Sequence, residues 1–247
     1  MPALITLLTD YGTADSYVAE VKGVLLSRVH GAQLIDITHQ VTPGDLRAGQ
    51  YILGRVWHRF PQGTVHLAVV DPGVGTARRA LAAGAGGHFF VAPDNGLLSC
   101  LPADAHFVSL PIPPSAAPTF HARDVFAPAA AQLAIGASLT QLGHAITDPY
   151  RSPLPAARHD GAAVVGEVLY VDRFGTLVSN IPGYQVEPGV RVKVAGTDVG
   201  TLVRTFGDVA RGQLVALVGS GGTVEIAVRD GSAARMLGVG VGAEVRA

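Results

Sequence analysis

The sequence VVDPGVGTARR (residues 69–79) ends a run of β-branched apolar residues with an acid, a proline and two glycines. With the residues before it, it predicts a buried strand over TVHLAVVD (64–71) that stops at Asp71. Pro72 fixes its own φ and the glycines permit a sharp reversal of the chain, so we expect Arg78 to return toward Asp71. An arginine beside a carboxylate holds it ionised and oriented. Such a pair also has a purely structural interpretation, as a brace for the turn.

The pattern around this stretch is typical of an α/β domain. Further strands are expected at residues 3–10, 32–38 and 88–96. Helices are expected from Asp15 or Ser16 to Gly31, from Asp45 to Pro61, and over 123–136 with Pro128 in the first turn. Strands that alternate with helices, each nearly continuous in apolar residues, predict a mostly parallel sheet.

The pattern of expected elements changes after RSPLPAARHDG (151–161), which we expect to be a linker. Short strands separated by glycine turns follow, over residues 166–181, 190–196, 198–206, 212–220 and 223–231. This pattern predicts a small barrel or sandwich. The expected organisation is therefore an α/β domain over 1–150, the linker over 151–161, and a smaller all-β, barrel-like domain over 162–247.

Composition excludes several classes of function. The chain has 247 residues, of which 48% are hydrophobic and 15% charged, and its formal net charge is −1. No basic surface is indicated, so we expect no nucleic-acid partner. Cys100 is the only cysteine, which leaves no disulfide within one chain and no CxxC metal site. The start of the chain lacks the features of a signal peptide, and no apolar run approaches a membrane span, so we expect a cytoplasmic protein without membrane contact.

Three acids, Asp10, Asp71 and Asp94, each stand at the end of an expected strand. In open α/β sheets, ligands bind outside the carboxyl ends of the strands, so these acids indicate a polar ligand with hydroxyls or positive charge. Aspartate is also a common turn and capping residue, which explains any one of them alone.

Two histidines stand near these features. His121, in FHARD (120–124), precedes the last expected helix and is suited to hold or move a proton, although a lone histidine is more often structural. His39 follows a strand end. A metal site built on Asp10, Asp71, His39 and His121 is an alternative, but no HxH or HExxH spacing supports it.

The glycine-rich stretch VGSGGTVE (218–225) permits a backbone nest for a carboxylate or phosphate, and equally a hairpin turn. The chain has no GxGxxG, no GxxxxGK[ST] and no GxSxG motif. No motif therefore indicates binding of nucleotide phosphates or a serine nucleophile.

Seven segments together resemble one enzyme family in sequence and order: LLTDYGTADSYVAEVKGV, DITHQVTPGDLRAG, VVDPGVGTARR, APDNGLLS, TFHARDVFAP, VDRFGTLVSNI and GSGGTVEIAV. The chain resembles the S-adenosyl-L-methionine (SAM) hydrolases, also called SAM hydroxide adenosyltransferases, which are relatives of fluorinating and chlorinating enzymes. The resemblance spans nearly the whole chain, and its longest motifs are specific.

The resemblance implies an α/β domain, a β-barrel domain and a homotrimer with SAM between neighbouring subunits. It implies that water or hydroxide attacks C5′ of the ribose, so that SAM gives adenosine and methionine without a metal or cofactor. The family's catalytic acid, arginine and histidine match Asp71, Arg78 and His121. Its substrate contacts match Asp10 for ribose and, in the second domain, Asp172, Phe174, Thr176, Ser220, Glu225 and the Val228 backbone.

Two departures from the family pattern stand beside this match. Thr176 stands where the family's DxFGN stretch has asparagine, and a hydroxyl cannot copy the paired donor and acceptor of an amide. Ala122 replaces the usual glycine beside His121. The Thr176 departure keeps open a SAM or adenosine sensor with little turnover. A halide-using adenosyl transferase and the metal-dependent hydrolase are the other two alternatives. A carboxylate at position 71 would repel a halide in a dry pocket, which favours water as the nucleophile.

Overall fold

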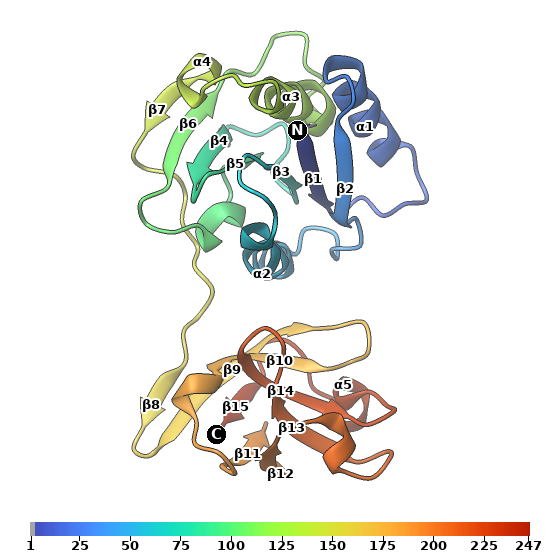
Figure 1. The fold of residues 1–247 in the computed structure, drawn as a ribbon, viewed down its shortest axis with the longest axis vertical. Coiled ribbons are helices and arrows are strands. Elements are labelled where there is room, and N and C mark those ends of the chain that lie inside the picture. The colour runs from blue at the N-terminus through green and yellow to red at the C-terminus, as the bar shows by residue number, and fades with distance from the viewer. Residues whose placement is uncertain (1–2) are drawn as a thin grey trace. The chain divides into compact units, whose positions relative to one another are not determined.

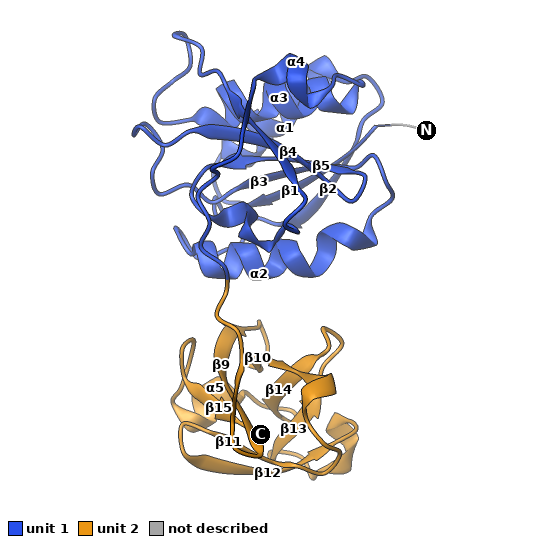
Figure 2. Cartoon of the chain, turned by 90° about the vertical axis from the view of Figure 1, so that its left-hand side faces the viewer, with its two compact units in different colours: residues 1–153 blue, residues 154–247 orange. Residues whose placement is uncertain are grey.

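A computed structural model of the chain describes residues 3–247. The chain divides into two compact units, one that ends at Pro153 and one over Leu154–Ala247 (Figure 2). The expected linker, residues 151–161, spans this boundary, and its last part forms a short strand, β8 (Arg158–Asp160). No helix within residues 3–247 combines the length and the apolar character that a membrane crossing requires.

The first unit is built on a seven-stranded sheet with the order β2-β1-β3-β5-β4-β6-β7. The strands are β1 (Leu4–Thr9), β2 (Gln33–Thr38), β3 (Val65–Val69), β4 (Ala80–Ala85), β5 (His88–Pro93), β6 (His106–Leu110) and β7 (His144–Ile146). Neighbours among β2, β1, β3 and β5 pair in parallel, whereas β4, β6 and β7 pair antiparallel. The four expected strands are the four parallel ones, so the α/β class is confirmed with a mixed sheet.

Helices cover both faces of this sheet. They are α1 (Tyr17–Arg28), α2 (Leu46–Val56), α3 (Ala127–Ala134) and α4 (Leu139–Leu142), with a π-helical turn at Ala122–Phe126 directly before α3. Figures 1 and 2 show α1 and α3 on one face and α2 on the other. Asp45 caps α2 as expected, because its carboxylate accepts a hydrogen bond from the Ala48 backbone N–H at 2.9 Å.

A buried pair of histidines lies at the N-terminal ends of β3 and β5. His66 Nδ1 lies 2.8 Å from the Thr6 hydroxyl, and His66 Nε2 lies 3.2 Å from His88 Nδ1. Burial, followed by the neighbouring His88, lowers the pKa of His66 to about 3. Burial likewise lowers the pKa of His88. Both rings are therefore held neutral in the folded chain at neutral pH.

This pair predicts acid lability of the first unit. The unfolded chain binds protons at these histidines below about pH 6.5, whereas folded His66 resists protonation down to about pH 3. The free energy of unfolding should therefore fall by about 1.4 kcal/mol per pH unit through this window on account of His66, and His88 contributes in the same direction. Chemical denaturation of the wild type and of His66→Gln at several pH values measures it. An unchanged slope in the variant would contradict the assignment.

The second unit is a barrel, as the sequence predicts. Its strands are β9 (Ala163–Val171), β10 (Leu177–Pro182), β11 (Arg191–Val194), β12 (Thr197–Val203), β13 (Leu214–Val218), β14 (Thr223–Val228) and β15 (Glu244–Arg246). The sheet order is β10-β14-β13-β12-β11-β15-β9-β8, and pairing of β10 with β9 closes the ring, with β8 added at the side of β9. The short helix α5 (Ala233–Leu237) follows β14. The barrel core is made largely of valine, isoleucine and leucine side chains from these strands.

Candidate active site

Asp71, Arg78 and His121 lie together beyond the end of β3. Asp71 follows β3, Arg78 precedes β4, and His121 stands directly before the π-helical turn. The turn between the first two closes through hydrogen bonds from Val74 N to Asp71 O at 3.3 Å and from Thr76 N to Gly73 O at 3.2 Å. This reversal brings the guanidinium back beside the carboxylate, as the spacing predicts.

Arg78 connects the other two side chains. Its Nε donates to Asp71 Oδ1 at 3.0 Å and its Nη2 donates to Asp71 Oδ2, so the pair is bidentate. The same Nη2 lies 2.9 Å from His121 Nδ1. The Asp71 and Arg78 side chains are only 5% and 8% exposed, and His121 is 4% exposed. A buried ion pair with this geometry holds the carboxylate in one orientation.

The contact to Arg78 also sets the state of His121. A guanidinium only donates, so Nδ1 of His121 must be the acceptor and the ring proton must reside on Nε2. Burial, and then the positive charge of Arg78, lower the pKa of His121, while Asp71 and Asp124 oppose this effect. The ring is therefore neutral, with one N–H donor left for another partner.

A cavity of about 170 Å³ opens beside this cluster. It is lined by Tyr11, Tyr17, Asp71, Val74, Thr119, Phe120, His121 and Ala122. Burial, followed by the charges of Asp10 and Asp71, raises the pKa of Tyr11 well above its usual value, so its hydroxyl stays protonated. The cavity thus presents a carboxylate acceptor, neutral donors and aromatic rings.

Asp10 lies directly after β1, on the neighbouring strand end. Its Oδ2 accepts a hydrogen bond from Gly44 N at 2.8 Å, which ties the end of β1 to the loop before α2. Asp94, the third acid at a strand end, forms an ion pair with Arg79 at 2.7 Å and accepts from Tyr150 N at 2.7 Å. Asp94 therefore braces the chain, whereas the contact of Asp10 with Gly44 N uses its Oδ2.

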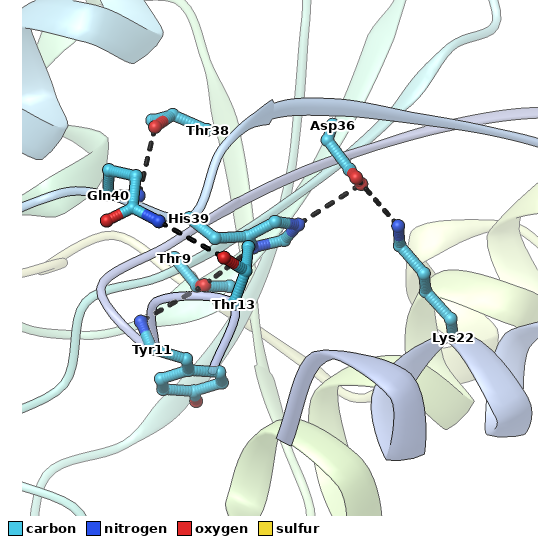
Figure 3. A network of polar contacts seen from close by, with 8 residues as sticks. All are labelled: Thr9, Tyr11, Thr13, Lys22, Asp36, Thr38, His39 and Gln40. Atoms are coloured by element: carbon cyan, nitrogen blue, oxygen red, sulfur yellow. Dashed lines mark hydrogen bonds and ion pairs between the residues drawn. The ribbon is translucent and has the colours of Figure 1, made fainter. Parts of the chain in front are cut away.

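His39 contacts the end of β1, where Asp10 follows (Figure 3), and it is not among the residues that line the Asp71 cavity. Its Nδ1 is 2.8 Å from the Thr9 hydroxyl, which also accepts from Tyr11 N at 3.3 Å. Its Nε2 is 3.1 Å from Asp36 Oδ1, and Asp36 pairs with Lys22 at 2.7 Å. Throughout residues 3–247, no three His, Cys, Asp or Glu side chains gather as a metal site would require, so the alternative with His39 and His121 as ligands finds no geometric support.

The second unit has its own pocket, of about 850 Å³, on the barrel. Five of the expected substrate-binding residues line it: Asp172, Phe174, Thr176, Glu225 and Val228. Asp172 Oδ1 accepts from the backbone N–H of Phe174 at 2.9 Å and of Thr176 at 2.8 Å, so it shapes the β9–β10 turn. Phe174 is 77% exposed, whereas Thr176 is buried. A large exposed ring over a pocket of this size suits a flat ligand group.

Ser220 is the expected residue that does not line this pocket. It lies in the turn between β13 and β14, where Gly219 N donates to Thr223 O at 2.9 Å. The Glu225 side chain packs so closely against Gly219 that a Cβ there would meet Glu225 Oε1 at 1.9 Å. The glycine-rich stretch is thus a hairpin turn whose glycine makes room for Glu225.

Comparison with known proteins matches both units to one family. Residues 5–143 match the SAM hydroxide adenosyltransferase N-terminal domain, and residues 166–246 match the C-terminal domain of the same family. The chain belongs to the SAM hydroxide adenosyltransferase family. An (R)-S-adenosyl-L-methionine hydrolase of Salinispora tropica is 42% identical over 252 residues, which cover 98% of this chain and 96% of that protein.

Two further proteins are similar to this chain at lower sequence identity. A fluorinase of Actinoplanes sp. is 29% identical over 276 residues, covering 92% of each chain. The crystal structure of an uncharacterized conserved protein from Thermotoga maritima superposes with a TM-score of 0.90 at 34% identity and covers 98% of both chains.

Three aromatic side chains of this family member were not expected at the site. Tyr11, Tyr17 and Phe120 line the Asp71 cavity. Their positions give a signal in retrospect, because Tyr11 directly follows Asp10, Tyr17 follows soon after, and Phe120 directly precedes His121. Aromatic residues so close to expected site residues are candidates for the walls of the site.

Proposed function

We propose that this protein hydrolyses SAM to adenosine and L-methionine, and that Asp71, Arg78 and His121 are its catalytic residues. The observation that carries the proposal is a buried, oriented carboxylate with two positioned partners beside a small cavity. The full-length similarity to a protein named (R)-S-adenosyl-L-methionine hydrolase supports the reaction and favours the R configuration at sulfur.

The sulfonium of SAM is already a good leaving group, so the reaction needs no acid to protonate it. It needs a water molecule held in line behind C5′. Asp71 accepts a hydrogen bond from that water and takes its proton as the oxygen attacks carbon. The C5′–S bond breaks, its electron pair stays on sulfur, and methionine leaves as a neutral thioether. Arg78 keeps the Asp71 carboxylate oriented, and His121 contributes its Nε2–H donor.

Water is favoured over a halide by the charge of the cavity. A halide beside the Asp71 carboxylate would meet an anion in a buried site, which costs several kcal/mol. The experiment is incubation of purified protein with SAM, with and without chloride, and identification of the products by mass. Adenosine and methionine, unchanged by chloride, support the proposal. A 5′-chloro nucleoside would contradict it, and no product despite tight adenosine binding would favour the sensor.

The barrel pocket is proposed to bind the adenine and methionine parts of the substrate. Asp172, Phe174, Thr176, Glu225 and the Val228 backbone are the proposed contacts there, with Ser220 in the adjoining turn. Asp10 is proposed to hold the ribose through its carboxylate.

Thr176 allows a direct test of the adenine contact. Thr176→Asn supplies the paired donor and acceptor that a hydroxyl lacks, so KM for SAM should fall by about two- to tenfold, the worth of one net hydrogen bond. Thr176→Val, which keeps the shape and removes the hydroxyl, is the matched control and should raise KM. If KM is the same in all three proteins, residue 176 does not contact the base. Steady-state kinetics measures this.

The homotrimer that the family resemblance implies is also a proposal. Sedimentation equilibrium tests it directly, since the chain mass is 25.4 kDa. A particle of three chain masses supports it, and a stable monomer with full activity would contradict it.

A further inference from the structure

Three aromatic rings meet in the cavity beside Asp71. Tyr11, Tyr17 and Phe120 each contact the other two, with ring centroids 5.9 Å, 6.1 Å and 5.3 Å apart. Their planes are inclined to one another by 56°, 71° and 87°, so they do not form a flat stack. Inclined, edge-to-face contacts of this kind are a favoured arrangement of aromatic pairs. All three line the cavity that Asp71 and His121 also line.

Most of the charged side chains around this cavity are paired. The Asp71 carboxylate is bound by the Arg78 guanidinium through both oxygens, and His121 is neutral. Arg123 lies over the Phe120 ring at 5.1 Å, but Arg123 is itself paired with Glu20 and Asp124. Asp10 adds a carboxylate near Tyr11, so these side chains together carry a net negative charge that also attracts a cation. The rings add a second source of attraction, because the face of an aromatic ring is electron-rich.

The reaction geometry places the sulfonium within reach of these rings. In an in-line displacement, the attacking water lies about 3 Å from C5′, and sulfur lies on the opposite side of that carbon. The cavity of about 170 Å³ is much smaller than the barrel pocket of about 850 Å³, and it is the one that Asp71 and His121 line, so we place the reacting centre of the substrate in it. A cation within about 6 Å of a ring centroid is attracted by the ring.

We propose that Tyr11, Tyr17 and Phe120 form an aromatic cage that recognises the positive charge of the sulfonium and selects it over neutral thioethers. This inference rests on the proposed function, because it concerns the same site. The positive charge disappears as the C5′–S bond breaks, so the cage stabilises the bound substrate more than the transition state. It should therefore lower KM without raising kcat, and it should hold the neutral product methionine less tightly than the substrate.

The test compares two ligands that are not turned over. One is the nitrogen analogue of SAM, in which a protonated methylated tertiary amine replaces the sulfonium. The other is S-adenosyl-L-homocysteine, a neutral thioether with the same adenosine and amino-acid groups. The dissociation constants are measured by calorimetry below the pKa of the amine, and their ratio is the charge preference. The wild type should favour the cation by about tenfold.

Removal of a ring should weaken this preference, and retention of the ring should keep it. Tyr11→Leu and Phe120→Leu keep apolar volume without a π face, so the ratio should fall severalfold while the thioether still binds. Tyr11→Phe and Tyr17→Phe keep the rings and remove only the hydroxyls, so the ratio should stay within about twofold of the wild type. Binding of the thioether shows that each variant retains a folded site.

The outcomes separate this inference from the proposed function. Turnover of SAM by the wild type tests the function independently of the ratio. If SAM is hydrolysed but the leucine variants keep the tenfold preference for the cation, the proposed aromatic cage is wrong. Equal weakening of both ligands in the leucine variants would also overturn it, because the rings would then be apolar walls only.

Discussion

Asp71→Asn should lower kcat for SAM hydrolysis by about a thousandfold, because an amide cannot take the proton of the attacking water. The amide keeps the size of the carboxylate and one acceptor oxygen for Arg78, so the fold should persist. Single-turnover kinetics with SAM measures the loss, and thermal denaturation checks the fold.

The matched control is Asp94→Asn. Asp94 is also an acid at a strand end, and its side chain is as buried as that of Asp71, but it pairs with Arg79 and accepts from Tyr150 N. Its neutralisation should reduce stability and leave most of the activity. Normal turnover by Asp71→Asn would show that the carboxylate is not the base.

Arg78→Lys should lower kcat by about a hundredfold although it keeps the positive charge. A lysine ammonium cannot donate to both Asp71 oxygens and to His121 Nδ1 from one plane, so the carboxylate loses its fixed orientation. A misplacement of about 1 Å is enough for a loss of this size.

Arg78→Met adds a pH signature to this prediction. The charge of Arg78 is one of the causes that lower the pKa of His121, so its removal should raise that pKa toward the ordinary value. Protonation of His121 would then occur at higher pH, and the acid limb of the kcat/KM profile should move up the pH scale. An unmoved limb would show that neutral His121 is not required, and wild-type kcat in Arg78→Lys would contradict the positioning role.

The parallel half of the first sheet could be predicted because its strands are apolar and are bounded by turn residues. The antiparallel half could not. β4 is ALAAGA, a run of alanine and glycine with low strand propensity, and it is a strand because β5 and β6 pair on its two sides. The π-helical turn before α3 was also unexpected, because residues 123–136 fit an ordinary helix by pattern.

The candidate active site could likewise be predicted only in part. The Asp71–Arg78 pair could be predicted because a proline and glycines reverse the chain between two residues seven positions apart. The contact between Arg78 and His121 joins residues 43 positions apart. It was expected only because the catalytic arginine and histidine of the family match these two residues. The three rings of the cavity were missed, because tyrosine and phenylalanine at helical or strand spacing are ordinarily core residues.

Hydrolysis of SAM in water enriched in ¹⁸O tests the central claim most directly. If water held by Asp71 attacks C5′, each adenosine formed carries one ¹⁸O atom at its 5′-oxygen, and methionine carries none. Mass spectrometry of both products measures this. Unlabelled adenosine, or ¹⁸O in methanol or in a homoserine product, would place the attack elsewhere and contradict the account.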